Sequence, residues 1–305
     1  MIDILSKRYL YFVVSLIVIL PGLILLATNG LPLSIDFTGG SLLEVQFEGG
    51  QTPQPGEIVN LYETIGIDDA QVQTTESGTL LIRSSFLDNE ARDRVISTMK
   101  TETGSEVNVI RFDSVGPSIG AQVASRAALA VAAAALAVIV YITFAFSKVP
   151  NAFRYGVCAV IAMVHDVAVV FSVAGIGAVL FDWQMDALFL TALLTVIGFS
   201  VQDKVVVFDR IRENTSIFRR LDYETLVNHS IVQTLQRSIN TQLMTVEFLL
   251  LALILFGGVT LQEFASILLI GLLSGTYSSI FIAAPILVLW EKREWRNWFG
   301  RGATA

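Results

Sequence analysis

The chain has 305 residues, of which 53% are hydrophobic and 15% charged, and its mean hydropathy is +0.65. This composition is too apolar for a soluble domain of such length and predicts a polytopic membrane protein. The net charge of −7 argues against nucleic-acid binding, and the one cysteine, Cys158, excludes an internal disulfide framework or a cysteine-based metal site.

The first apolar run extends from Tyr9 to Thr28 and follows Lys7 and Arg8. At about twenty residues it is long enough to span a membrane. It resembles a signal peptide at its start, but no convincing small-residue cleavage site precedes Asn29. We therefore expect residues 1–33 to form an N-terminal tail and a retained transmembrane helix.

The segment from Ser34 to Gly116 is polar, is punctuated by glycine and proline, and contains no run long enough to cross a membrane. Its periodicity predicts strand, helix, strand, strand, helix and strand. These elements are expected at Leu42–Phe47, Pro55–Ile65, Ala70–Thr75, Thr79–Ser85, Asn89–Thr101, capped by Asn89, and Val107–Phe112. This βαββαβ order is that of an α+β ferredoxin-like domain, whose open sheet edges suit extended peptide. The domain has no His and no Cys, so we expect no catalytic or metal site in it.

Five more apolar runs lie in residues 117–291, and with the first run they predict a six-helix α-helical membrane protein. The runs are Ile119–Phe146, Ala152–Phe181, Met185–Phe208, Asn240–Phe256 and Gln262–Trp290. Residues 215–238 are too polar to span, and their apolar positions recur at i, i+4. We expect an amphipathic connector along the cytoplasmic interface, with Asp222 as a cap and Ile217, Leu221, Val227, Ile231 and Leu235 on its apolar face.

Lys and Arg are concentrated in alternate connections, which predicts the orientation of the chain. They lie in residues 7–8, 148–154, 210–220 and 292–301, whereas residues 181–185 and 257–261 contain none. The bias places both termini, including the tail at residues 292–305, in the cytoplasm. The domain at residues 34–116 is then extracytoplasmic.

Asp203 and Lys204 lie well inside the apolar stretch Leu194–Asn214. An Asp or Lys near the bilayer centre costs roughly 2.5 to 3.5 kcal/mol even on the milder insertion scales, so such residues are rarely there for stability. The pair indicates an ion or proton pathway, and the alternative is that the two charges neutralise each other as a packing feature. Other polar residues expected inside helices are His165, Asp166, Asn240 and Glu247.

Several motifs together resemble the SecD/SecF family of bacterial protein-export membrane proteins, which belongs to the RND transporter superfamily. They are Ser34-Ile-Asp36-Phe-Thr38-Gly39-Gly40, Val115-Gly116-Pro117, His165-Asp166 and the stretch from Gly198 to Glu213. The resemblance covers nearly the whole chain in order. It implies a subunit of the SecD–SecF complex in the bacterial inner membrane, with SecD, the SecYEG channel, YajC and a translocating unfolded preprotein as partners.

In such a complex an ion gradient drives motion of the extracytoplasmic domain, so the chain is expected to be a translocation subunit rather than an enzyme. The resemblance implies Asp203 as the coupling acid and no cofactor beyond the coupling ion, H⁺ or Na⁺. Motion would reach the outer domain through two short tethers that act as hinges. Their residues are Asp36, Thr38, Gly39, Gly40, Gly116 and Pro117.

The chain departs from the family pattern around the expected site. It has Gln202-Asp203-Lys204 where the family usually has Asn-Asp-Thr, and Thr241 where an Arg usually follows Asn240. We hypothesise that Lys204, with Glu247 nearby, supplies the charge balance that the Arg gives elsewhere, while Asp166 and His165 hydrate the path. Lys can lose its proton when it is desolvated, whereas Arg effectively cannot.

Two other functions fit parts of the sequence. A scaffold that stabilises SecD or the channel without ion transfer is favoured somewhat by the missing Arg. An RND-type exporter of small molecules would carry a much larger outer region, with two such domains per chain. An enzyme is not favoured, because no nucleophile–base pair or cofactor-binding loop is recognisable.

Overall fold

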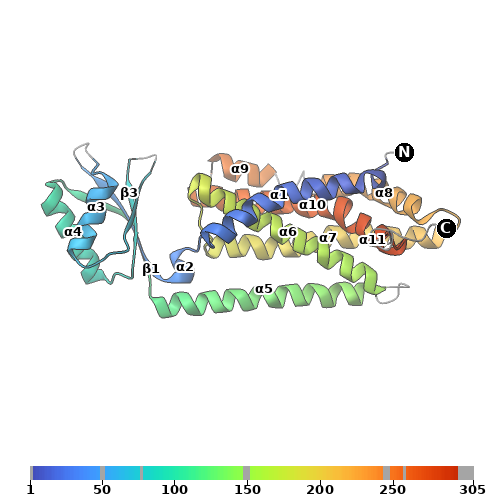
Figure 1. The fold of residues 1–305 in the computed structure, drawn as a ribbon, viewed down its shortest axis with the longest axis horizontal. Coiled ribbons are helices and arrows are strands. Elements are labelled where there is room, and N and C mark those ends of the chain that lie inside the picture. Colours follow the sequence, from blue (N-terminus) through green and yellow to red (C-terminus); the bar gives the residue numbers. More distant parts are fainter. Residues whose placement is uncertain are drawn as a thin grey trace, which may run out of the picture. The chain divides into compact units, whose positions relative to one another are not determined.

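The structure is a computed structural model, and it describes residues 3–48, 52–75, 78–146, 152–242, 248–256 and 259–294. The chain divides into two compact units (Figure 1). One unit is Leu33–Leu129, and the other combines Met1–Pro32 with Ala130–Ala305.

The first unit contains a four-stranded antiparallel sheet in the order β2-β3-β1-β4. The strands are β1 Gly40–Phe47, β2 Gln71–Thr74, β3 Leu80–Ser84 and β4 Val107–Val115. Helices α3 (Pro55–Thr64) and α4 (Asn89–Thr103) lie between strands in the expected order. The sheet and helices bury a core that includes Leu43, Val45, Tyr62 and Met99.

Three local details of this unit differ from the sequence prediction. The N-cap of α4 is Asp88 rather than Asn89, because the Asp88 carboxylate accepts a 2.7 Å bond from the amide of Ala91. Strand β4 continues to Val115, and its last residue pairs with Gly40 at the start of β1. A short helix, α2 (Ile35–Thr38), precedes β1 and is capped by Ser34, whose hydroxyl accepts from the amide of Asp36.

The predicted hinge residues come together where α2, β1 and the first turn of α5 (Pro117–Ala145) meet. Gly39 has a φ of +76°, and a Cβ added to it would lie 2.7 Å from the Cα of Pro117. A Cβ on Gly120 would lie 2.5 Å from the amide nitrogen of Gly39. Glycine is therefore needed at Gly39 both for its backbone conformation and for close contact between backbones.

The second unit is a bundle of long apolar helices. Its elements are η1 (Leu5–Lys7), α1 (Arg8–Asn29), the later part of α5, α6 (Ala152–Phe181), α7 (Ala187–Ile217), α8 (Tyr223–Gln242), α9 (Phe248–Phe256), α10 (Val259–Ser278), η3 (Ser279–Ala283) and α11 (Ala284–Glu291). Element η3 is a single π-helical turn, so α10, η3 and α11 form one continuous helix.

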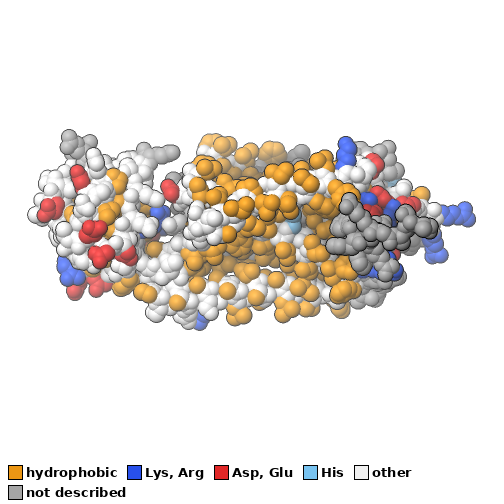
Figure 2. All heavy atoms as spheres, viewed as in Figure 1, with side chains coloured by type: hydrophobic (Ala, Val, Ile, Leu, Met, Phe, Trp, Pro, Cys, Tyr) orange, Lys and Arg blue, Asp and Glu red, His pale blue; other side chains and the backbone are white. Residues whose placement is uncertain are grey.

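Five helices among the described residues are long and apolar enough to cross a membrane. They are Leu5–Asn29, Pro117–Ala145, Phe153–Phe181, Ala187–Ile217 and Leu261–Glu291. The predicted span Asn240–Phe256 falls partly outside the described residues; its described parts are the end of α8 and the apolar helix α9. Hydrophobic side chains cover most of the bundle surface that Figure 2 shows, as expected for a surface in contact with lipid.

Helix α7 is longer than its apolar run suggested, and α8 begins at the predicted cap. Helix α7 continues past Phe208 to Ile217, because its buried face continues through Ile211 and Asn214. Helix α8 begins after Asp222, whose side chain accepts from the amide of Glu224 and so provides the predicted cap. Of the predicted apolar face of the connector, Val227 and Ile231 are buried and Leu235 is partly buried, whereas Ile217 and Leu221 are exposed.

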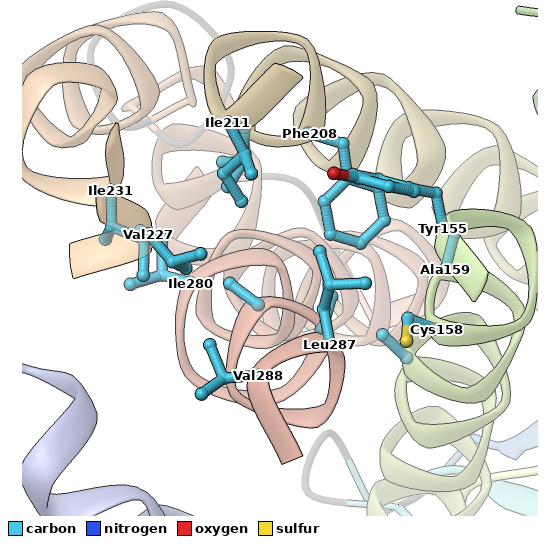
Figure 3. Packing of buried hydrophobic residues seen from close by; sticks show 14 of the residues in the cluster. Tyr155, Cys158, Ala159, Phe208, Ile211, Val227, Ile231, Ile280, Leu287 and Val288 are labelled. Atoms are coloured by element: carbon cyan, nitrogen blue, oxygen red, sulfur yellow. The ribbon is translucent and has the colours of Figure 1, made fainter. Parts of the chain in front are cut away.

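The bundle is held together by aromatic packing and by close backbone contacts. Phe208 of α7 meets Tyr155 of α6 edge to face, with Ile211 and Leu287 in the same buried cluster (Figure 3). Helices α1 and α6 approach so closely that a Cβ on Gly22 would lie 1.9 Å from the carbonyl oxygen of Ser172. The hydroxyl of Ser172 donates a 2.7 Å bond to the carbonyl of Val18, which fixes this crossing.

Charged side chains from three separate parts of the bundle unit form one cluster. Arg8 of α1 bonds Glu224 of α8 and Glu294, each at 2.8 Å, and Lys292 bonds Glu224 at 2.5 Å. Hydrogen bonding from Lys292, joined by Arg8, holds the pKa of Glu224 below its ordinary value of 4.5. The same bond to Glu224 raises the pKa of Lys292 above 10.5.

Gly39→Ala should destabilise the sheet unit more than Gly66→Ala does. Both residues have positive φ, but nothing lies within 4 Å of a Cβ at Gly66. Gly66→Ala should therefore cost only the backbone term of about 1 to 2 kcal/mol, and Gly39→Ala should add roughly 1 to 3 kcal/mol of overpacking. Pulse proteolysis of the full chain in urea measures both values. Equal losses would show that close contact with Pro117 is unimportant.

Acid should weaken the cluster around Glu224. A lowered carboxyl pKa stabilises the folded chain above pH 4.5, and this contribution is lost as the pH falls through the lowered value. The raised pKa of Lys292 stabilises below pH 10.5 and is lost only at still higher pH. The pair is partly exposed, so we expect at most about 1 kcal/mol. Thermal melts at pH 7 and pH 3.5 should show a smaller acid-induced drop for Glu224→Gln than for the wild type. The control is Glu213→Gln, which alters a more exposed ion pair. Equal acid-induced decreases in melting temperature for Glu224→Gln and the wild type would refute the prediction.

Candidate functional site

A buried ion pair joins α6 to α7 in the helix bundle. The ammonium of Lys204 lies 2.8 Å from Oδ2 of Asp166, and the two side chains are 0% and 1% exposed. Desolvation of two charges is expensive, so a pair at this depth persists only with good geometry and further hydrogen bonds. Both conditions are met here.

Serine hydroxyls complete the surroundings of this pair. Ser200 and Ser278 donate to Oδ2 of Asp166 at 2.5 and 2.7 Å, and Ser274 donates to Oδ1 at 2.8 Å. The ammonium of Lys204 also bonds the carbonyl and the hydroxyl of Ser200. Its three protons therefore have three acceptors, and the pair is fully satisfied.

Asp203 lies on a different face of α7, because consecutive residues of a helix point about 100° apart. It is 6% exposed, and its two oxygens accept from Ser238 of α8 at 2.6 Å and Ser279 of η3 at 2.5 Å. No Lys or Arg among the described residues forms an ion pair with it. Within this part of the chain, hydroxyl groups rather than a cation bond the carboxylate.

His165 connects Asp166 to α1. Its Nδ1 is 3.1 Å from Oδ1 of Asp166, and its Nε2 is 2.9 Å from the hydroxyl of Ser15. A carboxylate oxygen only accepts, so Nδ1 carries the proton in this contact. The hydroxyl of Ser15 is 3.4 Å from that of Tyr277, which donates to the carbonyl of Tyr11. A line of polar groups thus runs from the buried pair to α1.

Small residues on α10 bring these groups together. A Cβ on Gly271 would lie 2.3 Å from a methyl carbon of Val196, and one on Gly275 would lie 3.3 Å from the Cα of Ser200. Ser274 and Ser278 share a helix face with them at i, i+4 spacing, and that face meets α6 and α7. The close contact of α10 with α7 is what allows short serine side chains to reach Asp166.

The π-helical turn Ser279–Ala283 also has a local cause. Pro285 lies two residues beyond it and has no amide proton to give the helix, and its ring clashes with the carbonyl four residues earlier. A wider turn before the proline relieves this conflict. The irregularity that Pro285 causes places Ser279 against Asp203.

The predicted site residues are only partly brought together. Asp166, His165 and Lys204 form one constellation. Asp203 lies on a different face of α7, so Lys204 pairs with Asp166 and not with Asp203. Asn240 is exposed near the end of α8. Glu247 lies outside the described residues. The predicted hinge residues belong to the sheet unit.

The serines around both carboxylates were not predicted. These are Ser200, Ser274 and Ser278 at Asp166, and Ser238 and Ser279 at Asp203. The signal available in the sequence was the spacing of Ser274, Ser278 and Ser279 beside Gly271-x-x-x-Gly275. No group of three or more His, Cys, Asp or Glu in the described ranges is arranged to hold a metal ion.

Several known proteins that are similar to the chain belong to one family. Residues 95–293 match the C-terminal family of the protein export membrane proteins SecD/SecF, and residues 24–50 match the SecD/SecF GG motif. The protein translocase subunit SecF of Anaerolinea thermophila is 68% identical over 303 residues, which covers 99% of this chain and 98% of that protein.

Similarity extends to proteins in which SecD and SecF are one chain. The protein translocase subunit SecDF of Bacillus subtilis is 33% identical over 96% of this chain and 38% of its own length. The crystal structure of SecDF from Thermus thermophilus, described as a translocon-associated membrane protein, superposes with a TM-score of 0.81 at 29% identity. The superposition covers 96% of this chain but only 39% of that one.

Lys204→Met should destabilise the bundle strongly, because it leaves Asp166 buried and charged without its cation. The expected loss is about 3 to 5 kcal/mol, and the double variant Asp166→Asn, Lys204→Met should recover much of it. Thermal unfolding of the purified membrane protein measures both. A single variant as stable as the wild type would show that the pair is not needed for the fold.

Proposed function

The chain belongs to the SecD/SecF family of protein export membrane proteins, and we propose that it couples a transmembrane ion gradient to preprotein export through Asp203. The chain is a membrane protein with several apolar helices and a subunit of the protein export machinery. The family name does not say how an ion gradient would be coupled to movement of the helix bundle.

The observation that carries the proposal is the contrast between two buried carboxylates. Asp166 pairs with Lys204 and accepts hydrogen bonds from three serines, so its charge is compensated within the bundle. Asp203 is almost as buried, yet hydroxyl groups alone bond it among the described residues. A charge without a buried partner is costly at this depth, and binding of a proton or Na⁺ removes that cost. Asp203 is therefore the acid suited to load and release an ion.

A groove of about 460 Å³ between α7 and α8 supports access to this acid. It is lined by Val205, Val206, Asp209, Arg210, Glu213, Gln233, Thr234 and Arg237. Thr234 lies one turn from Ser238 on α8, and Val206 lies one turn from Asp203 on α7. Water in this groove would reach within a helical turn of the carboxylate.

A transmembrane potential can supply enough energy to shift a conformational equilibrium. One elementary charge that crosses a potential of 100 mV releases roughly 2.3 kcal/mol. A conformational equilibrium balanced within a few kcal/mol responds strongly to that amount. Loading and unloading of Asp203 from opposite sides, in the form of H⁺ or Na⁺, would shift the bundle between two arrangements.

The proposed topology has six transmembrane helices, with both termini in the cytoplasm of a bacterial cell and the sheet domain on the extracytoplasmic side of the inner membrane. The basic residues Arg8, Arg154 and Lys292 support it, since each bonds an acid of α8 or of the end of α11, and the positive-inside rule assigns that end to the cytoplasm. The antiparallel order β2-β3-β1-β4 supports a ferredoxin-like domain.

The relatives that join SecD and SecF in one chain support SecD as the partner that completes the membrane bundle. The translocon association described for the Thermus structure supports the SecYEG channel as a second partner. We extend the proposal to an unfolded preprotein as the substrate outside the membrane and to YajC as a further associated subunit.

Asp203→Asn should abolish the part of export that depends on the ion gradient, because a neutral amide cannot cycle an ion. Export into inverted vesicles that contain the variant and its partner subunit, with and without an imposed H⁺ or Na⁺ gradient, measures this dependence. The matched control is Asp182→Asn in the same bundle, an exposed acid just after α6 that does not line the groove.

The response of the control should equal that of the wild type. Gradient-stimulated export that survives Asp203→Asn would exclude Asp203 from coupling. In that case the bundle would serve as a scaffold for its partners.

A further inference from the structure

Two consecutive serines of α10 and η3 bond two different carboxylates. The hydroxyl of Ser278, the last residue of α10, donates to Oδ2 of Asp166 at 2.7 Å. The hydroxyl of Ser279, the first residue of the π-helical turn, donates to Oδ2 of Asp203 at 2.5 Å. The transition from α-helix to π-helix therefore lies between the contacts to the two acids.

The two acids differ in how many other groups bond them. Asp166 keeps its bonds to Lys204, Ser200 and Ser274 whether or not Ser278 is present. Among the described residues, Asp203 accepts from Ser238 and Ser279, so Ser279 provides one of these two hydroxyl contacts. A hydroxyl bonds a carboxylate considerably more strongly than it bonds a neutral acceptor. The contact at Ser279 thus depends on the charge of Asp203, whereas the one at Ser278 is set by a fixed ion pair.

The π-helical turn is an element with a second available arrangement. A π-helical turn is less favourable than a regular α-helix, and it persists where a neighbour compensates for it. Pro285 provides part of that compensation and the bond from Ser279 to Asp203 provides another part. When the bond weakens, the residues after Ser279 are less firmly held in the wide turn.

We propose that Ser279 is a positioning residue for Asp203 that links the charge of this carboxylate to the geometry of the π-helical turn Ser279–Ala283. Loss of the negative charge, by ion loading or by substitution, weakens the bond and loosens the turn. This inference rests on the proposed function only for the identity of the event that neutralises Asp203. The structural linkage between the two residues stands independently of it.

Movement of the turn has a defined route to other elements. Phe281 within it contacts the rings of Tyr11 on α1 and Tyr277 on α10, at centroid distances of 4.5 and 5.0 Å. The turn continues into α11, whose Leu287 and Val288 belong to the buried cluster shared with α8. After α11 comes Lys292, which bonds Glu224 at the start of α8. A change in the turn therefore acts on α1 and on the connector α8.

Hydrogen–deuterium exchange of the full chain, purified with its partner subunit in nanodiscs, tests the linkage, because backbone amides report local opening. The segment followed is residues 279–291. We expect about tenfold faster exchange in Asp203→Asn and in Ser279→Ala, which corresponds to one hydrogen bond to a charged group. The double variant should exchange no faster than Ser279→Ala alone, since both substitutions act on the same contact.

Two further variants separate positioning from a general loss of packing. Ser278→Ala removes a neighbouring hydroxyl of the same size and should leave exchange of this segment within about twofold of the wild type, because Asp166 retains its other partners. Ser279→Thr keeps the hydroxyl and should restore slow exchange. Equal acceleration by Ser278→Ala, or additive effects of Asp203→Asn and Ser279→Ala, would overturn the proposal.

The outcome can be distinguished from failure of the proposed function. If the exchange results are as expected while Asp203→Asn retains gradient-driven export, the linkage holds and ion coupling through Asp203 fails. If Asp203→Asn abolishes gradient-driven export but leaves exchange of residues 279–291 unchanged, coupling holds and the linkage through Ser279 is wrong.

Discussion

The interaction on which the bundle depends is the buried pair of Asp166 and Lys204. Two opposite charges at this depth are tolerated only because serines from α7 and α10 satisfy their remaining hydrogen-bonding groups. This requirement determines the orientation of three helices at once, since α6 supplies the acid, α7 the base and α10 two of the hydroxyls. Because the ammonium of Lys204 is bonded to Asp166, it does not pair with Asp203. The difference between the surroundings of the two acids is thus a consequence of how the bundle neutralises Asp166.

The departure from the expected family pattern at Thr241 can be related to the groups that bond Asp203. Thr241 cannot supply a cation, and Lys204, the nearest basic residue in sequence to Asp203, is committed to Asp166. Among the described residues, Asp203 is instead bonded by the neutral hydroxyls of Ser238 and Ser279, and these bonds are strongest while the carboxylate is charged.

Most of the architecture could be predicted from the sequence, because apolar runs and alternating strands have strong periodic signals. The order of the sheet domain and the cap at Asp222 were predicted on this basis. The extension of α7 beyond Phe208 was not, since its last turns are polar outside and buried on only one face. The partner of Lys204 could not be predicted either. It depends on the rotation of α6 about its axis, and that rotation is decided by contacts such as Gly22 with Ser172, which are distant in sequence.

The pairing of Gly40 with Val115 and the contact of Gly39 with Pro117 have a mechanical consequence. The strand that enters the sheet domain and the one that leaves it are bonded side by side at their base, and the leaving strand runs directly into a helix. A pull that moves these two ends together loads both strands at once and leaves the hydrogen bonds between them intact. A pull that separates the ends would open the ladder one pair at a time from its base, because the strands are antiparallel. The sheet domain is therefore suited to turning as one body about this base and is weak against a force that parts the two strands.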